Sequence, residues 1–188
     1  MLYCLRTIVC WSCLSLCVLT HADHDYLDEP NILAADGFQQ VFSRVAPNIY
    51  VSGQPTPSGL AKAKELGVTT VVNLRTAFEM NDRGTVDFDE AAEIDNLGLT
   101  YVHIPQGGPD TPYSPAAVAK FASAVKDAKG NVLLHCTVAW RASHLWAAYL
   151  VEYHDVPLPL AVGIGKQVNL GSLPLEGFLG KKLEFGLK

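Results

Sequence analysis

Short apolar runs that alternate with capped helical segments are the feature that most restricts the fold of this chain. Four runs have the composition of short buried strands, namely residues 48–52, 69–74, 100–104 and 132–134. Four further segments carry helix start and stop signals, namely residues 57–67, 87–97, 115–129 and 141–154. Strands that alternate with helices of this length predict an α/β domain with a central, mostly parallel sheet flanked by helices.

The last predicted strand leads directly into His135 and Cys136. The helix that follows is apolar on nearly all sides, which predicts that it is buried. In parallel α/β sheets, ligands bind beyond the carboxyl ends of the strands, so Cys136 is predicted at a ligand-binding edge. Residues 75–86 lack apolar periodicity and are predicted as a polar loop, and residues 157–188 as further helical segments punctuated by glycines.

The first 22 residues have the features of a secretory signal peptide. They contain no acidic side chain, carry Arg6 near the start, run apolar from residue 8 to residue 19 and end at Ala22. Cleavage there predicts an exported protein, periplasmic or secreted, without a stable membrane span; an uncleaved N-terminal anchor is the alternative. Residues 23–42 are polar and acidic and are predicted as a linker or N-terminal arm, and residues 43–188 as the domain.

Charge and cysteine usage restrict the partners. The chain has 14 basic and 19 acidic residues, a formal net charge of −5 and no basic stripe, which argues against binding to nucleic acid or an anionic membrane. All cysteines except Cys136 lie in the first 22 residues, so after cleavage Cys136 has no disulfide partner and a reactive role is expected. The histidines are scattered singly, so neither a metal site nor a cofactor is predicted.

The order strand, Cys136, short loop, Arg141, helix predicts an anion site that bears a nucleophile. A chain that passes from a strand into a helix directs unpaired backbone amides to one point, where the helix dipole adds positive charge. This field favours the thiolate of Cys136, and the planar guanidinium of Arg141 can grip two phosphate oxygens. The loop amides of the predicted site are those of Thr137, Val138, Ala139 and Trp140. The chemistry expected is hydrolysis of a phosphate monoester through a cysteinyl-phosphate.

A general acid is also needed to protonate the leaving oxygen, and Asp110 is the best candidate. It lies on the loop after the strand at 100–104, which is expected next to the strand that delivers Cys136. Asp82 and Asp87, on the preceding loop, are weaker candidates. Plainer alternatives exist for both main assignments: a cysteine after an apolar strand can be a small core residue, and Asp110 can be a turn residue.

Other polar residues near the motif are given supporting roles. His135 is predicted to hydrogen-bond near the thiolate without touching substrate, and His103 to be a satisfied strand residue. Arg75 can reach the same sheet edge and touch substrate, or it can form a surface salt bridge with Glu79 or Glu90.

A resemblance to a known family rests on four motifs, which are VAPNIYVSGQPTP (45–57), TTVVNLR (69–75), GLTYVHIP (98–105) and VLLHCTVAWR (132–141). Together they resemble the beta-lactamase-hydrolase-like phosphatases, bacterial relatives of the dual-specificity and tyrosine phosphatases. The resemblance implies a phosphatase-like three-layer α/β fold and a phosphorylated substrate. It also implies Cys136 as nucleophile, Arg141 and the loop amides as phosphate ligands, and an acid near Asp110.

The loop departs from its relatives in two ways. Four residues separate Cys136 from Arg141, where tyrosine phosphatases have five, and this spacing is similar both to the subfamily and to many rhodanese sulfurtransferases. The subfamily usually has a small polar residue, then Gly or Ala, then Asn, where this loop has Val138, Ala139 and Trp140. A positive φ at such a position would cost a non-glycine residue about 1 kcal/mol or more.

These departures leave several interpretations open. Trp140 can be a pocket wall that stacks on an aromatic or nucleobase substrate, or, as the favoured interpretation, a core residue that anchors the loop. Hydrolysis of phosphate monoesters is the leading function. Rhodanese-like sulfur transfer through a Cys136 persulfide is second, and a catalytically weak anion-binding or redox module is third.

Overall fold

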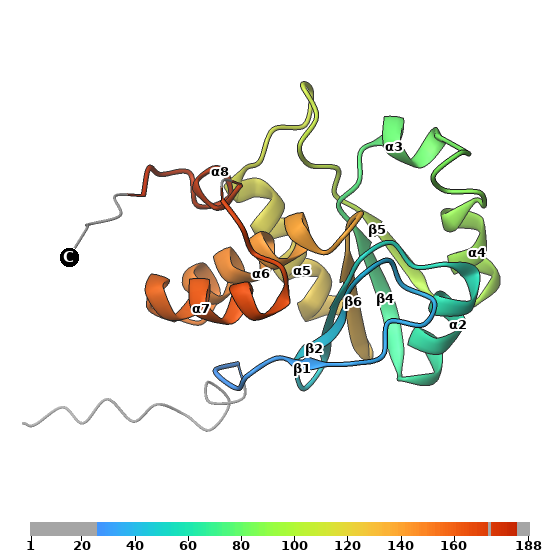
Figure 1. Cartoon of the computed structure of the whole chain (residues 1–188), viewed down its shortest axis with the longest axis horizontal. Helices are drawn as coiled ribbons and strands as arrows, with labels where there is room; N and C mark the ends of the chain where they lie inside the picture. The colour runs from blue at the N-terminus through green and yellow to red at the C-terminus, as the bar shows by residue number, and fades with distance from the viewer. Residues whose placement is uncertain (1–25, 173, 184–188) are drawn as a thin grey trace, which may run out of the picture.

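The computed structural model describes residues 26–172 and 174–183 and confirms the α/β architecture (Figure 1). The signal peptide predicted for residues 1–22 lies outside the described residues. The elements, in chain order, are β1 (Asn31–Ile32), β2 (Phe42–Ala46), β3 (Ile49–Ser52), α2 (Pro57–Glu65), β4 (Val68–Asn73), α3 (Ala77–Asn81), α4 (Glu90–Asn96), β5 (Thr100–His103), α5 (Pro115–Asp127), β6 (Asn131–His135), α6 (Trp140–Tyr153), α7 (Leu158–Val168) and α8 (Leu175–Leu179).

The sheet has the strand order β1-β2-β3-β6-β4-β5. Its four strands β3, β6, β4 and β5 run parallel and are the four predicted from the sequence, so the mostly parallel sheet is confirmed. β1 and β2 extend it antiparallel at one edge. Because parallel strands end at one edge, the segments after β3, β6, β4 and β5 come together there.

The predicted arm at residues 23–42 packs on the sheet where it is described. Asn31–Ile32 pairs with β2, and the buried ring of Phe38 stacks on Phe42 with their centroids 4.0 Å apart. The polar composition of the arm concealed this contact, because only a few apolar side chains make it.

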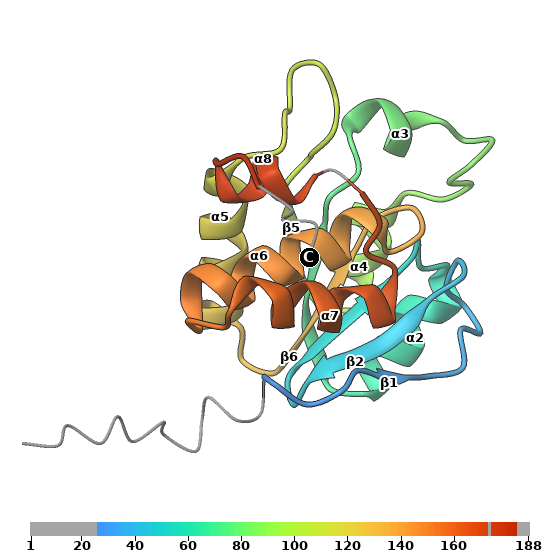
Figure 2. The same cartoon turned by 60° about the vertical axis from the view of Figure 1, so that its left-hand side comes forward.

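Helices cover both faces of the sheet (Figure 2). α2 and α4 pack on one face against a cluster that includes Leu60 and Ile94, and α5 to α8 lie on the other. α6 is confirmed as an interior helix, since every residue from 141 to 150 is buried and Trp146 is fully so. Among the described residues, no helix is long and apolar enough to cross a membrane.

Capping residues set where the helices begin. α2 starts at the predicted residue 57. Thr56 is its N-cap, and the Thr56 Oγ1 accepts a hydrogen bond from the Gly59 amide at 3.2 Å. α4 starts at Glu90, later than the predicted residue 87, because Asp89 accepts the Ala92 amide hydrogen bond and acts as the N-cap.

The prediction of a loop over residues 75–86 was wrong in part, because this segment contains α3. Thr76 and Glu79 form a capping box in which each side chain accepts a hydrogen bond from the other residue's amide, at 3.2 and 2.9 Å. No residue of α3 is buried. The helix therefore has no apolar stripe from which periodicity could reveal it.

Candidate active site

Cys136 lies at the junction between β6 and α6, as the sequence predicted. Only 1% of its surface is exposed, and its amide donates a hydrogen bond to the Ser52 carbonyl oxygen at 3.4 Å. Within the described residues it is the free cysteine. The loop from Cys136 leads directly into the N-terminus of α6, the helix end that attracts anions.

The loop between Cys136 and α6 is held from two sides. The Gln54 amide donates to the Thr137 carbonyl oxygen at 2.8 Å, and Asn169 Nδ2 donates to the Val138 carbonyl oxygen at 2.6 Å. These bonds tie the loop to the end of β3 and to the end of α7. Because the carbonyl groups of Thr137 and Val138 are both bonded to other segments, the loop has little freedom to rearrange.

Ala139 adopts φ 64° and ψ −3°, in the left-handed region, so a non-glycine residue does carry positive φ in this loop. This conformation costs an L-residue about 1–2 kcal/mol. Ala139 is fully buried, and packing around it holds the strained conformation.

Gly53 allows β3 to approach the loop closely. A Cβ atom at this position would lie 1.8 Å from the Gln39 carbonyl oxygen and 3.0 Å from that of Thr137. These separations leave no room for a side chain. Glycine is therefore required where the arm, β3 and the Cys136 loop meet.

Arg141 donates hydrogen bonds through both terminal nitrogens. Nη1 donates to Glu79 Oε2 at 2.9 Å and to the Gln106 carbonyl oxygen at 2.8 Å. Nη2 donates to Glu79 Oε1 at 2.6 Å and to Thr137 Oγ1 at 3.0 Å. Nη1 also approaches the Leu74 carbonyl oxygen at 3.4 Å. Each nitrogen carries two hydrogens, so these partners engage all four. The fork predicted to grip phosphate thus grips the Glu79 carboxylate.

Glu79 is a site residue that the sequence analysis missed. Burial by itself raises the pKa of its carboxyl, but Arg141 and Thr76 outweigh this effect and lower the pKa to about 2. Burial likewise lowers the pKa of Arg141, and the Glu79 carboxylate outweighs it and raises the pKa. The signal that could have revealed Glu79 was the capping box with Thr76, which places it on a short helix after β4.

A second buried carboxylate, Glu90, lies on the α4 face of the sheet. It accepts hydrogen bonds from the side-chain amides of Gln54 and Asn73, the latter at 2.7 Å. Its Oε1 lies 3.2 Å from Nε2 of His135, which is an ion-pair distance. Burial raises the pKa of Glu90, but His135 and these hydrogen bonds outweigh it and lower the pKa. The His135 imidazole, predicted near the thiolate, therefore contacts Glu90.

Arg75 is 3% exposed and connects the two carboxylate clusters. Its Nη1 donates to Gln54 Oε1 at 2.8 Å, and its Nε lies 3.5 Å from Glu79 Oε1. The salt bridge with Glu79 is therefore internal, whereas the sequence analysis considered a surface one. His103 is satisfied by a contact of 2.7 Å between its Nε2 and the Arg75 carbonyl oxygen.

Asp110 is exposed and lines a cavity of about 510 Å³ that it shares with Glu79. Phe78 forms another wall of this cavity and is 87% exposed. Asp82 and Asp87 do not line it, and Asp82 instead accepts hydrogen bonds in the turn after α3. Of the three acid candidates, only Asp110 lines a cavity together with Glu79, the partner of Arg141; Cys136 and Arg141 themselves do not line this cavity.

Trp140 packs away from this cavity. Its ring meets His144 edge to face, with centroids 5.1 Å apart, and its Nε1 lies against Gly171. This placement is that of an anchor between α6 and the segment after α7. The pocket-wall interpretation has no contact to support it.

Tyr113 is a second residue that the sequence analysis did not single out. Burial raises the pKa of its hydroxyl, while Arg141 acts to lower it and Cys136 to raise it. The hydroxyl is therefore within electrostatic reach of both. In residues 26–172 and 174–183, no group of three His, Cys, Asp or Glu side chains is arranged to hold a metal ion.

The family model of the beta-lactamase hydrolase-like protein, phosphatase-like domain, matches residues 41–151, more than half of the chain. The chain belongs to this family. The match includes the four parallel strands, the Cys136 loop and most of α6, so the family assignment covers the candidate site of this phosphatase-like domain.

Curated and solved relatives agree with the assignment. A beta-lactamase hydrolase-like protein of Xylella fastidiosa is 31% identical over 97 residues, which are 52% of this chain and 22% of the relative. The phosphatase-like domain thus matches about a fifth of the length of that protein. A DUF442 protein of Shewanella putrefaciens is 25% identical, with a TM-score of 0.59 over 77% of this chain and 91% of that one.

More distant structures share the fold. PTPMT1 in complex with PI(5)P has a TM-score of 0.62 at 15% identity, covering 74% of this chain and 92% of its own. TpbA of P. aeruginosa in complex with pTyr has a TM-score of 0.56 at 17% identity, covering 73% of this chain and 77% of its own. The phosphatase-like domain therefore has the fold of the tyrosine and dual-specificity phosphatases, and the resemblance to its family is confirmed.

Proposed function

We propose that this phosphatase-like domain hydrolyses phosphate monoesters through a cysteinyl-phosphate on Cys136. The observation that carries the proposal is the position of Cys136 and Arg141 at the two ends of a loop between a parallel strand and the N-terminus of α6. Such a junction attracts a phosphate group, and the thiolate then lies within the same loop. The pTyr bound to the similarly folded TpbA supports a phosphorylated ligand.

In the proposed first step, the Cys136 thiolate attacks phosphorus, an S–P bond forms, and the P–O bond to the leaving group breaks. Protonated Asp110 gives its proton to the leaving oxygen, which departs as an alcohol or phenol. In the second step, Asp110 removes a proton from water, the resulting hydroxide attacks phosphorus, and the S–P bond breaks. Inorganic phosphate leaves, and the thiolate is restored.

The Glu79 carboxylate has to leave the Arg141 fork before both terminal nitrogens can bind phosphate. α3 carries Glu79 and has no buried residue, so its displacement would disturb little packing. Thr137 also bonds Glu79, with 3.1 Å between Oγ1 and Oε1, and would lose this contact. We therefore propose that substrate binding exchanges one oxyanion for another on Arg141.

Release of phosphate from p-nitrophenyl phosphate tests the function. The proposal requires that Cys136→Ser abolish release, and that Arg141→Lys, which keeps the charge but not the fork, reduce it by at least about 100-fold. Vanadate should compete with substrate. Activity that survives Cys136→Ser would exclude the mechanism. Thiocyanate formation from thiosulfate and cyanide, without phosphatase turnover, would instead identify a sulfurtransferase.

Asp110→Asn tests the acid. The loss of rate should be larger for a phosphate ester with a poor alcohol leaving group than for p-nitrophenyl phosphate, because a good leaving group needs little protonation. Asp82→Asn is the matched control and should leave both rates unchanged. An equal loss for both esters would remove Asp110 from the acid role.

A further inference from the structure

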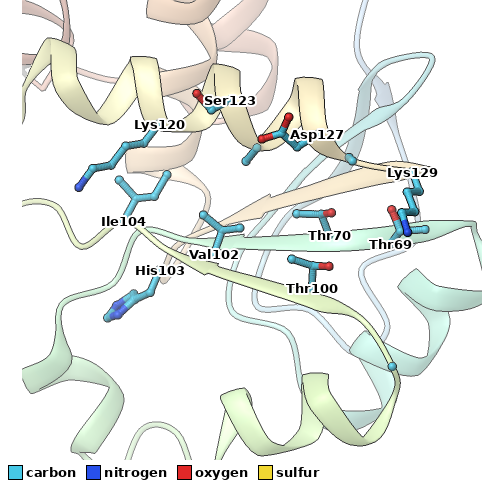
Figure 3. Close-up of a pocket in the computed structure, with 13 residues that line it drawn as sticks. Thr69, Thr70, Thr100, Val102, His103, Ile104, Lys120, Ser123, Asp127 and Lys129 are labelled. Carbon is cyan, nitrogen blue, oxygen red and sulfur yellow. The ribbon is translucent and has the colours of Figure 1, made fainter.

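A groove of about 710 Å³ runs between α5 and the edge strand β5 (Figure 3). Lys120 lies at one end near Ile104, Asp127 lies toward the other end above Thr100, and Val102 lies between them. None of the site residues at the Cys136 loop lines this groove. It is therefore a surface separate from the candidate active site.

β5 has an open edge. The Ile104 amide donates to the Asn73 carbonyl oxygen of β4 at 2.9 Å. The bonding side alternates along a strand, so the main-chain groups of Val102 face β4 and those of Tyr101 and His103 face outward. In the described part of the chain, β4 is the one strand that pairs with β5. An unprotected edge of this kind is a template for another strand.

The charges that line the groove have no partner within the described chain. The lining contains three such side chains, Lys120, Asp127 and Lys129, all of them exposed and none in an ion pair there. Asp127 is the last residue of α5, where the helix dipole disfavours a carboxylate. A nearby positive charge from outside the chain would compensate it.

We propose that the β5 edge and its groove pair with the same surface of a second copy of this chain. The two β5 strands would run antiparallel about a two-fold axis at Val102. Tyr101 would exchange both of its main-chain hydrogen bonds with His103 of the second copy, and His103 with Tyr101 of the second copy. Two-fold symmetry then places Val102 of one copy opposite Val102 of the other, with their Cβ atoms about 5 Å apart.

The same axis makes the pair Lys120 and Asp127 self-complementary. Lys120 and Asp127 are placed on either side of the point above Val102, so a two-fold rotation brings Lys120 of one copy toward Asp127 of the other, twice. Across the dimer the strand order would be β4, β5, β5, β4, so the two β4 strands would be three inter-strand spacings, about 14 Å, apart. The two α5 helices lie above these β4 strands and would be separated by a similar distance. Extended lysine and aspartate side chains can meet across the space left between two such helices. This charge pattern favours a second copy over an unrelated peptide.

Sedimentation of the full chain over a wide concentration range tests the proposal. We expect a reversible dimer that is weakened by salt, because its strands are short and its charges are near the surface. Lys120→Asp or Asp127→Lys alone should raise the dimer dissociation constant by about tenfold or more, since each creates two like-charge contacts. The double exchange should restore it. Lys126→Asp, an exposed reversal on α5 outside the groove, is the control.

Amide hydrogen exchange locates the interface independently. The Tyr101 and His103 amides should become protected as concentration rises, while the Ile104 amide, already bonded to β4, serves as the internal reference. A chain that stays monomeric, or a dimer indifferent to both charge reversals, would overturn the proposal and leave the groove to another occupant such as an extended peptide.

Discussion

Glu79 binds Arg141 through two parallel hydrogen bonds of 2.9 and 2.6 Å, so a carboxylate of the protein occupies the fork proposed for phosphate. The pair joins α3 to the first turn of α6 across 62 positions of sequence. A carboxylate and a phosphate cannot both take the terminal nitrogens at once. Binding at the Cys136 loop should therefore be coupled to the position of α3.

Glu79→Gln should strengthen anion binding. The substitution removes a competing charge next to the proposed phosphate site and leaves Arg141 with a neutral partner. The inhibition constant of phosphate or vanadate should therefore fall by about tenfold, which corresponds to about 1.4 kcal/mol of binding free energy. Competition against p-nitrophenyl phosphate measures it. Glu65→Gln, an exposed residue of α2, removes the same charge far from the loop and should change nothing. Weaker binding in Glu79→Gln would mean that the carboxylate positions Arg141 for phosphate.

Acid should destabilise the fold through the two site carboxylates. The folded pKa of Glu79, about 2, lies below its ordinary value of 4.5, and that of Glu90 is lowered too. A lowered pKa gives stability that is fully present above pH 4.5 and is lost as pH falls toward 2. Urea midpoints at about pH 7, 4.5 and 3 should therefore fall with pH, and Glu79→Gln should flatten the lower part of the curve. An unchanged slope in the variant would assign the acid loss to other groups.

Local signals were enough to predict most of the framework. The apolar runs of β3, β4, β5 and β6 and the start signals of α2 and α5 each lie within a few residues, and the structure confirms these strands and helix starts. α3 and β1 were missed because they are short and bury no side chain, and β2 because Ser43 and Arg44 interrupt its apolar run although four of its five residues are buried. Their stability comes from partners that are distant in sequence.

The same distinction applies to the site. Cys136 and Arg141 lie in one continuous motif, so the sequence brings them together directly. Glu79 and Tyr113 reach the loop from separate segments, and only the folded chain shows that they are close. Glu90 was considered as a surface partner of Arg75. It is buried, but it is the first residue of α4 and lies in a polar stretch of sequence, so its neighbours gave no sign of this burial.

Ala139→Gly should maintain or raise stability. Glycine removes the strain of φ 64° at this position, about 1–2 kcal/mol, and costs about 0.5–1 kcal/mol in chain entropy. A net gain between about 0 and 1.5 kcal/mol is therefore expected. Urea denaturation measures the difference. Ala119→Gly, at an exposed position within α5, is the matched control and should lose about 1 kcal/mol. Equal losses in the two variants would show that residue 139 carries no strain.

Phe78→Ala should change substrate preference and leave stability alone. The Phe78 ring is 87% exposed and lines the cavity that also holds Asp110, so it can stack on an aromatic leaving group without supporting the core. Removing the ring should raise KM for p-nitrophenyl phosphate by about three- to tenfold, an energy typical of one aromatic contact, with little change for an alkyl phosphate. Leu160→Ala is the control, because it removes an exposed apolar side chain from α7, outside the cavity. The decisive quantity is the ratio of the KM values for the aryl and the alkyl phosphate. An unchanged ratio would mean that Phe78 does not contact the leaving group. A shifted ratio at constant kcat would identify the cavity that Phe78 shares with Glu79 as the place where the aromatic ring binds.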